Sequence, residues 1–135
     1  MNSDDERREV ILQRLKESLQ ALAVPASEQV RLFPEFVVKT DELVLDFDHW
    51  QYCAMANYGS QMTEAQRTSL VALDSHTDGG SSAGRSIWDE QSLFTETFWD
   101  TARRLSKSAL EAFGWPLQVP PTHSSEYVRG HSAKT

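Results

Sequence analysis

The centre of the sequence carries a short ridge of side chains that could do chemistry. Glu42, Asp46 and His49 are four and three positions apart, so a helix would align them on one face. Asp46-x-x-His49 is a carboxylate variant of the Glu-x-x-His pair found in helical di-metal sites. A site of that kind needs equivalent ligands from other helices, which makes the rest of the chain decisive.

The nearest equivalent ligand group is Asp74, His76 and Asp78, and it is incomplete. Asp74 and Asp78 would share a helix face, whereas His76 would point elsewhere. The sequence therefore predicts neither a metal site nor a bound cofactor. A metal-dependent helical enzyme that uses Glu42, Asp46, His49 and Asp74 remains the alternative.

Other catalytic signatures are missing from the chain. Cys53 is the only cysteine, and its neighbours are largely apolar, so we expect a small buried side chain. As a nucleophile it would need a base such as His49, four positions before it. The sequence contains no Gly-x-Ser-x-Gly elbow, no phosphate-binding loop and no Gly-x-Gly-x-x-Gly fingerprint. We therefore predict a protein that is not an enzyme.

Charge is distributed unevenly along the 135 residues, which carry a net charge of −7. Residues 35–100 contain twelve acidic and three basic residues, a net charge of −9, while residues 101–135 contain two acidic and five basic residues, a net charge of +3. An anionic middle repels nucleic acid and anionic lipid, and it attracts basic partners. We expect a protein partner rather than nucleic acid or membrane.

The elements that must position these residues are helices. Helical periodicity and capping signals predict an all-α, compact bundle of about five helices, forming one domain over residues 1–116. Residues 117–135 lack periodicity, and we interpret them as a C-terminal tail of a composition typical of disorder. The predicted helices cover residues 3–24, 28–33, 40–57, 63–78, 86–93 and a last long helix from Thr95 or Thr97 to Phe113.

Residues 40–57 are the hardest of these segments to assign. Leu43 to Asp48 could alternate as a strand, but the length of the run and its spacing favour a helix. Each long helix has an apolar stripe that we expect to be buried. The stripes are Ile11, Leu15, Leu19 and Leu22; Leu43, Phe47, Trp50 and Ala54; Leu70, Leu73 and Thr77; and Phe98, Ala102, Leu105, Ala109 and Phe113.

Two of the four tryptophans stand next to acidic residues. Trp50 follows Asp48 and His49, and Trp88 precedes Asp89 and Glu90. An aromatic side chain framed by carboxylates is typical of an interface anchor, so we predict that Trp50 and Trp88 contact a partner.

The sequence shows no targeting or membrane signal. The first ten residues are charged, no apolar stretch of signal-peptide type follows them, and no apolar run reaches about 18 residues. We expect a cytoplasmic protein.

Three stretches resemble small acidic bacterial cytoplasmic proteins that are similar to immunity proteins of toxin–immunity pairs: LFPEFVV (32–38), DELVLDFD (41–48) and ALEAFGWP (109–116). The resemblance implies a binding protein that neutralises a cognate basic toxin domain through an acidic face. A homodimeric adaptor or regulatory module is a further alternative. The predicted partner-binding residues are Asp41, Glu42, Asp46, Asp48, Trp50, Asp74, Asp78, Trp88, Asp89 and Glu90.

Overall fold

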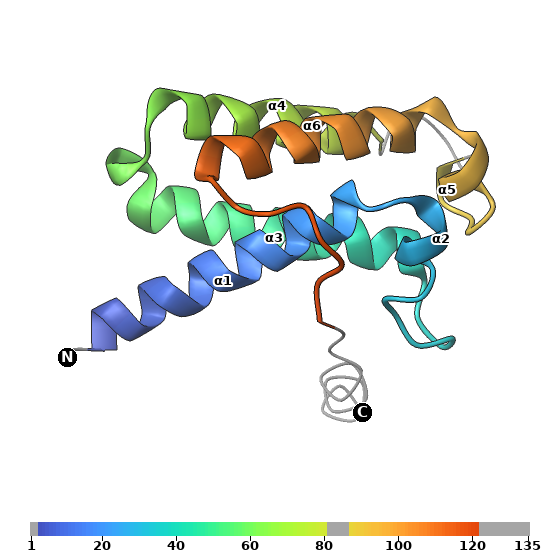
Figure 1. Cartoon of the computed structure of the whole chain (residues 1–135), viewed down its shortest axis with the longest axis horizontal. Helices are drawn as coiled ribbons and strands as arrows, with labels where there is room; N and C mark the ends of the chain where they lie inside the picture. Colours follow the sequence, from blue (N-terminus) through green and yellow to red (C-terminus); the bar gives the residue numbers. More distant parts are fainter. Residues whose placement is uncertain (1–2, 81–86, 122–135) are drawn as a thin grey trace.

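Four long helices and two single-turn helices make up the described part of the chain, residues 3–80 and 87–121 of a computed structural model (Figure 1). No strand occurs in these residues, which confirms the predicted all-α bundle. None of the helices described is both long enough and apolar enough to cross a membrane. The elements are α1 (Ser3–Ala23), α2 (Ala26–Gln29), α3 (Lys39–Tyr58), the 3₁₀ turn η1 (Gly59–Gln61), α4 (Glu64–Gly79), α5 (Ser92–Thr95) and α6 (Thr97–Phe113).

The four long helices form two layers. Helix α1 packs against both α3 and α6, and α4 packs against α6. Figure 1 shows α4 and α6 side by side along one edge of the molecule, with α1 and α3 below them. The single-turn helices α2 and α5 contact each other at one end of the bundle. Helices α3 and α4 are joined by a short turn and run antiparallel, yet they contact each other much less than α1 and α3 do.

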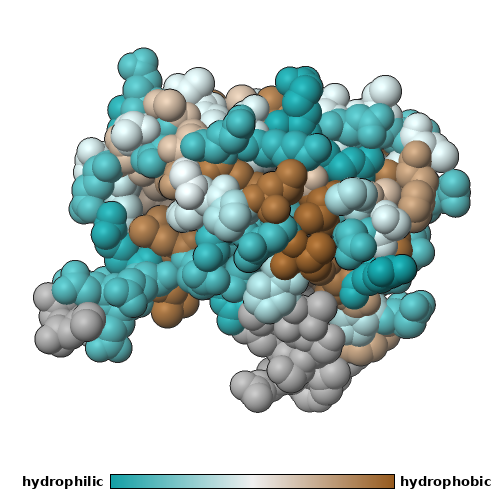
Figure 2. Space-filling model, in the orientation of Figure 1, coloured by the Kyte–Doolittle hydropathy of each residue, from teal (hydrophilic) through white to brown (hydrophobic). Residues whose placement is uncertain are grey.

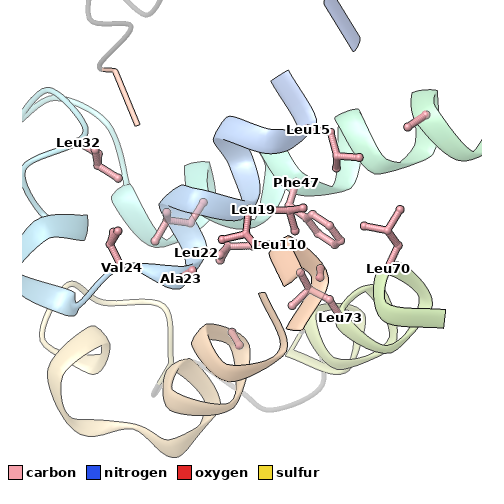
Figure 3. Packing of buried hydrophobic residues seen from close by; sticks show 14 of the residues in the cluster. Leu15, Leu19, Leu22, Ala23, Val24, Leu32, Phe47, Leu70, Leu73 and Leu110 are labelled. Carbon is pink, nitrogen blue, oxygen red and sulfur yellow. The ribbon is translucent and has the colours of Figure 1, made fainter. Parts of the chain in front are cut away.

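The core lies where the apolar stripes of these helices meet (Figure 3). Leu15, Leu19 and Leu22 of α1 are completely buried, and Leu15 and Leu19 lie beside Phe47 of α3, near side chains from α4 and α6. Burying a side chain of this size contributes roughly 1.5–3 kcal/mol. The predicted buried stripe of α1 is therefore confirmed, and so is that of α4.

Helix ends follow the signals in the sequence at two places. Thr63 forms a capping box with Gln66 at the start of α4. At the end of α6, Gly114 adopts φ 72°, and the Trp115 backbone N–H donates to the Leu110 carbonyl at 2.9 Å. This is a Schellman motif, and the Trp115 ring stacks on that of Phe113 with 4.4 Å between centroids.

Two short helices differ from their predicted bounds. The second helix spans Ala26–Gln29 instead of residues 28–33, because Pro25 starts it and Leu32 and Phe33 turn into the core. The helix predicted over 86–93 begins only at Ser92, whose backbone N–H donates to the Asp89 carboxylate at 2.9 Å. Ser86 itself lies outside the described residues.

The buried stripe of α6 is also rotated from the predicted one. Ala102 and Ala109 are buried as expected, but Phe98, Leu105 and Phe113 are only partly buried. The buried positions beside the alanines are Trp99, Ser106 and Leu110. Trp99 turns inward because its indole N–H donates to the Ile87 carbonyl at 2.9 Å, so the bundle satisfies its polar atom inside the core.

A buried polar network closes the end of α1. The Gln29 amide group, which is completely buried, donates to the carbonyls of Ala21 and Leu22 at 3.0 and 3.1 Å. Its oxygen accepts from the Arg103 guanidinium at 2.7 Å. Carbonyls at a helix C-terminus lack hydrogen-bond donors within the helix, so the Gln29 side chain supplies donors to the end of α1.

The segment after α6 crosses the face of the bundle and lies against α1 (Figure 1). The Gln20 side chain donates to the Pro116 carbonyl at 3.0 Å, and Pro120 is buried. Apolar surface gathers near the middle of this face (Figure 2). Pro120, which we assigned to the tail, therefore packs on the helices, while its neighbours 117–119 and 121 are exposed, and we call residues 115–121 the strap. The remainder of the predicted tail lies outside the described residues.

Candidate functional site

The predicted partner-binding residues of α3 lie on two different sides of the helix. Successive residues of a helix are rotated by about 100°, so Asp46 and Asp48 flank the buried Phe47 on opposite sides. Asp46 faces the groove between α1 and α3, where it lines a cavity. Asp48 faces α4, where its charge acts on Asp74. The helix thus places two acids that are only two positions apart in sequence on different sides.

A first group of predicted residues lies near the start of α3, and three of its members make contacts within the fold. Trp88 packs against the core, with its ring edge-on to Trp99 at 6.2 Å. Glu90 pairs with the buried ammonium group of Lys39 at 3.1 Å. The Asp89 carboxylate accepts from the Ser92 backbone, as described above. Asp41 is exposed in the first turn of α3.

A second group lines the cavity between α1 and α3. Asp46, His49 and Trp50 project from α3 into this cavity of about 290 Å³. Trp50 is partly buried, and its ring lies edge-on to the His49 ring with 4.5 Å between centroids. Glu42, one turn before Asp46, falls on the same side of α3 by its spacing. We call this site the α1–α3 pocket.

A third group brings acidic residues together from two helices. Burial raises the pKa of the Asp74 carboxyl above its usual range, and the charges of Asp48 and Asp78 raise it further. The Gln51 side chain donates to Asp74 at 3.2 Å and links α3 to α4. Asp48 and Asp78 are exposed. These carboxylates therefore form a surface on which like charges repel one another.

Exposed apolar side chains share this surface. On α3, Leu45 and Tyr52 are 59% and 68% exposed and lie three positions before and four after Asp48. On α4, Val71 is 51% exposed and precedes Asp74 by three positions. The sequence analysis missed these three residues, although the same i, i+3, i+7 pattern around each aspartate would have revealed them. We define the α3–α4 face as Leu45, Asp48, Tyr52, Val71, Asp74 and Asp78.

The ridge proposed for the metal-dependent alternative is not assembled into a ligand set. Asp46 and His49 line the α1–α3 pocket, whereas Asp74 lies beside Asp48 on the other side of α3. Within residues 3–80 and 87–121, no group of three or more His, Cys, Asp or Glu side chains is arranged to hold a metal ion. Cys53 is partly exposed rather than buried as predicted, with its Sγ 3.8 Å from His49 Nε2.

Two surfaces on opposite sides of α3 thus stand out as candidate sites. One is an exposed face of acids and apolar side chains, and the other is a small pocket with aromatic walls. Comparison of the chain with known protein families, with curated proteins and with solved structures finds no match.

Proposed function

We propose that this protein binds a basic protein domain through the α3–α4 face and thereby neutralises it, as an immunity protein neutralises its toxin. The single observation that carries the proposal is the convergence of Asp48, Asp74 and Asp78 from two helices: burial raises the pKa of Asp74, and the charges of Asp48 and Asp78 raise it further. A cationic side chain of a partner would relieve this repulsion.

The composition of the face supports a protein as the partner. Apolar side chains that are more than half exposed stand beside carboxylates on both helices. A protein interface commonly combines aromatic and apolar anchors, which exclude water, with charged residues around them. Tyr52, the most exposed of these, supplies a large contact area at a low cost in conformational entropy.

The charge of the middle of the chain supports a basic partner. The acidic surface lies within residues 35–100, where the formal charge is −9 from twelve acids and three bases. Such a surface steers a cationic partner toward the face and accelerates association at low salt. A toxin domain that acts on an anionic substrate has a basic cleft, which is why an acidic inhibitor suits it.

The experiment begins with capture of partners from a lysate of the source organism at low salt, using the full chain as bait and mass spectrometry for identification. Binding of the purified partner is then measured by calorimetry over a range of salt concentrations. Asp48→Lys/Asp78→Lys should weaken binding by roughly 100-fold and flatten its salt dependence, because two close charge pairs become repulsive.

Glu9→Lys/Glu111→Lys is the matched control, since both residues are exposed on other helices and the net charge changes by the same amount. The control should lose less than about tenfold in affinity, through the general field alone. Equal losses in the two double variants, or the absence of any basic partner in the capture, would refute the proposed face.

A further inference from the structure

The middle of the strap is exposed, although both of its ends are fixed to the bundle. At one end the Pro116 carbonyl accepts from the Gln20 side chain at 3.0 Å, and at the other end Pro120 is buried. Residues 117–119, between these two anchors, are all exposed. We propose that two copies of this chain associate here, through antiparallel pairing of residues 117–119. This inference is independent of the proposed function, because it uses no residue of the α3–α4 face.

The backbone of residues 117–119 has hydrogen-bonding groups that the fold does not use. Within the part of the chain that the structure describes, none of their N–H and C=O groups makes a hydrogen bond. The three residues form neither helix nor turn. Val119 precedes a proline, which disfavours helical backbone angles and favours an extended conformation. An exposed extended segment with unpaired backbone groups is a template for pairing with a second strand.

The prolines on either side limit how two straps can pair. Pro116 and Pro120 have no N–H, so a ladder of hydrogen bonds cannot continue past either of them. The symmetric antiparallel arrangement places Leu117 opposite Val119 of the second copy and Gln118 opposite its own counterpart. In an antiparallel pair, facing residues alternate between those that exchange two hydrogen bonds and those that exchange none. The Leu117–Val119 pairs can therefore exchange hydrogen bonds on both sides of Gln118.

The charge and exposure of the strap favour a second copy as the occupant. The side chains of Leu117 and Val119 are 54% and 48% exposed. No residue from 113 to 121 is charged, although the chain carries a net charge of −7. Two copies repel each other through their acidic surfaces, whereas at the strap they can meet without bringing like charges into contact. A charged partner would find no counter-charge in this segment.

The first test measures association of the full chain by sedimentation velocity. Pairing of three residues buries little area, so the average mass should rise only at high concentration, between about 10 μM and about 1 mM. Val119→Pro removes an N–H that the proposed pairing uses in both copies, and it should weaken association by roughly tenfold or more. Gln118→Pro is the matched control, because the Gln118 N–H points away from the second copy in this register.

Neither proline substitution removes a hydrogen bond of the described fold, so both variants should fold, which urea denaturation checks. Gln118→Pro should leave association nearly unchanged. The mass of a single chain at every concentration would overturn the proposal. A loss in Gln118→Pro that equals the loss in Val119→Pro would overturn it as well.

A second set of variants tests which residues face each other, at about 0.15 M salt to screen long-range repulsion. Leu117→Glu/Val119→Glu places like charges opposite each other and should abolish association, whereas Leu117→Lys/Val119→Glu places opposite charges there and should retain part of it. Leu45→Glu/Val71→Glu, at similarly exposed positions of the α3–α4 face, is the control and should leave association unchanged. Loss of association in this control, or equal behaviour of the two strap variants, would refute the pairing.

Discussion

The two sides of α3 differ in how they are built. Toward α1 the helices pack closely, and the groove between them has aromatic walls and charges of both signs. Toward α4 the contact is sparse: the Gln51 side chain donates to Asp74, and the carboxylates repel one another. One side is hollowed into a small cavity, while the other is an open surface with exposed apolar side chains.

The difference shows that charge density along a sequence is not charge density on a surface. Asp46 and Asp48 are two positions apart, yet one lines a pocket and the other belongs to the acidic face. Between them Phe47 is completely buried. A helix therefore gives two acids that are close in sequence different surroundings.

The largest expected effect on stability comes from replacing Phe47, whose side chain packs between the helices on both sides of α3. Phe47→Ala should lower the free energy of unfolding by about 3–5 kcal/mol, because it removes a completely buried ring from between α1, α3 and α4. Urea denaturation measures the change. Tyr52→Ala on the same helix is the control and should stay within about 0.5 kcal/mol, since Tyr52 is exposed. Similar losses in both variants would contradict the assigned core.

A smaller loss of stability should be confined to the α1 side and leave the α4 side unchanged. Gln29→Ala removes the bonds to the last carbonyls of α1 and leaves the Arg103 guanidinium without that acceptor. We expect a loss of about 2–3 kcal/mol by urea denaturation. Hydrogen exchange should accelerate at the end of α1, beside the pocket, and remain slow in α4. Uniform acceleration through both helices would show that the two sides do not open separately. Gln13→Ala, an exposed site on α1, is the control.

The smallest effect concerns the repulsion on the α4 side. The folded-state pKa of Asp74 is raised, so the folded protein holds the proton more tightly than the unfolded chain does. Stability contributed by the protonated form is therefore lost as the pH rises from the ordinary aspartate pKa of about 3.9 through the raised value. Asp74→Asn should gain about 0.5 kcal/mol at pH 7, and the gain should vanish below that window.

Thermal or urea unfolding across the pH range measures this gain. Asp48→Asn should produce a smaller gain, and the double variant should gain less than the sum of the two, because each substitution removes part of the same repulsion. Strict additivity, or a loss of stability in Asp74→Asn at pH 7, would mean that the carboxylates do not interact as described.

Much of the fold could be predicted because its signals are local. Thr63 with Gln66 starts α4, Gly114 ends α6, and the spacing of leucines in α1 gives its buried side. Residues 40–57, which could have alternated as a strand, form a helix as their length indicated. Each of these features depends on residues within one or two turns, where propensity and periodicity act directly.

The wrong predictions concern helix bounds and buried faces that depend on contacts between segments far apart in sequence. The stripe of α6 rotates toward Trp99 because the Ile87 carbonyl accepts from its indole. The second helix differs from its predicted bounds because Pro25 starts it and Leu32 and Phe33 turn into the core. Trp88 is partly buried and packs against the core, and its predicted contact with a partner stays a prediction. In each of these contacts the second residue is distant in sequence, so a pattern within one helix does not reveal it.

The sequence by itself determined the helices, their main ends, the acidic middle and the residues from which any site must be built. Only the tertiary structure decided which of those residues meet. It separated Asp46 from Asp48, joined Asp48 to Asp74, and closed a pocket with Pro120. The reason is physical: hydrogen bonding and periodicity act over a few residues, whereas packing and electrostatics act between atoms that approach only after the helices have assembled.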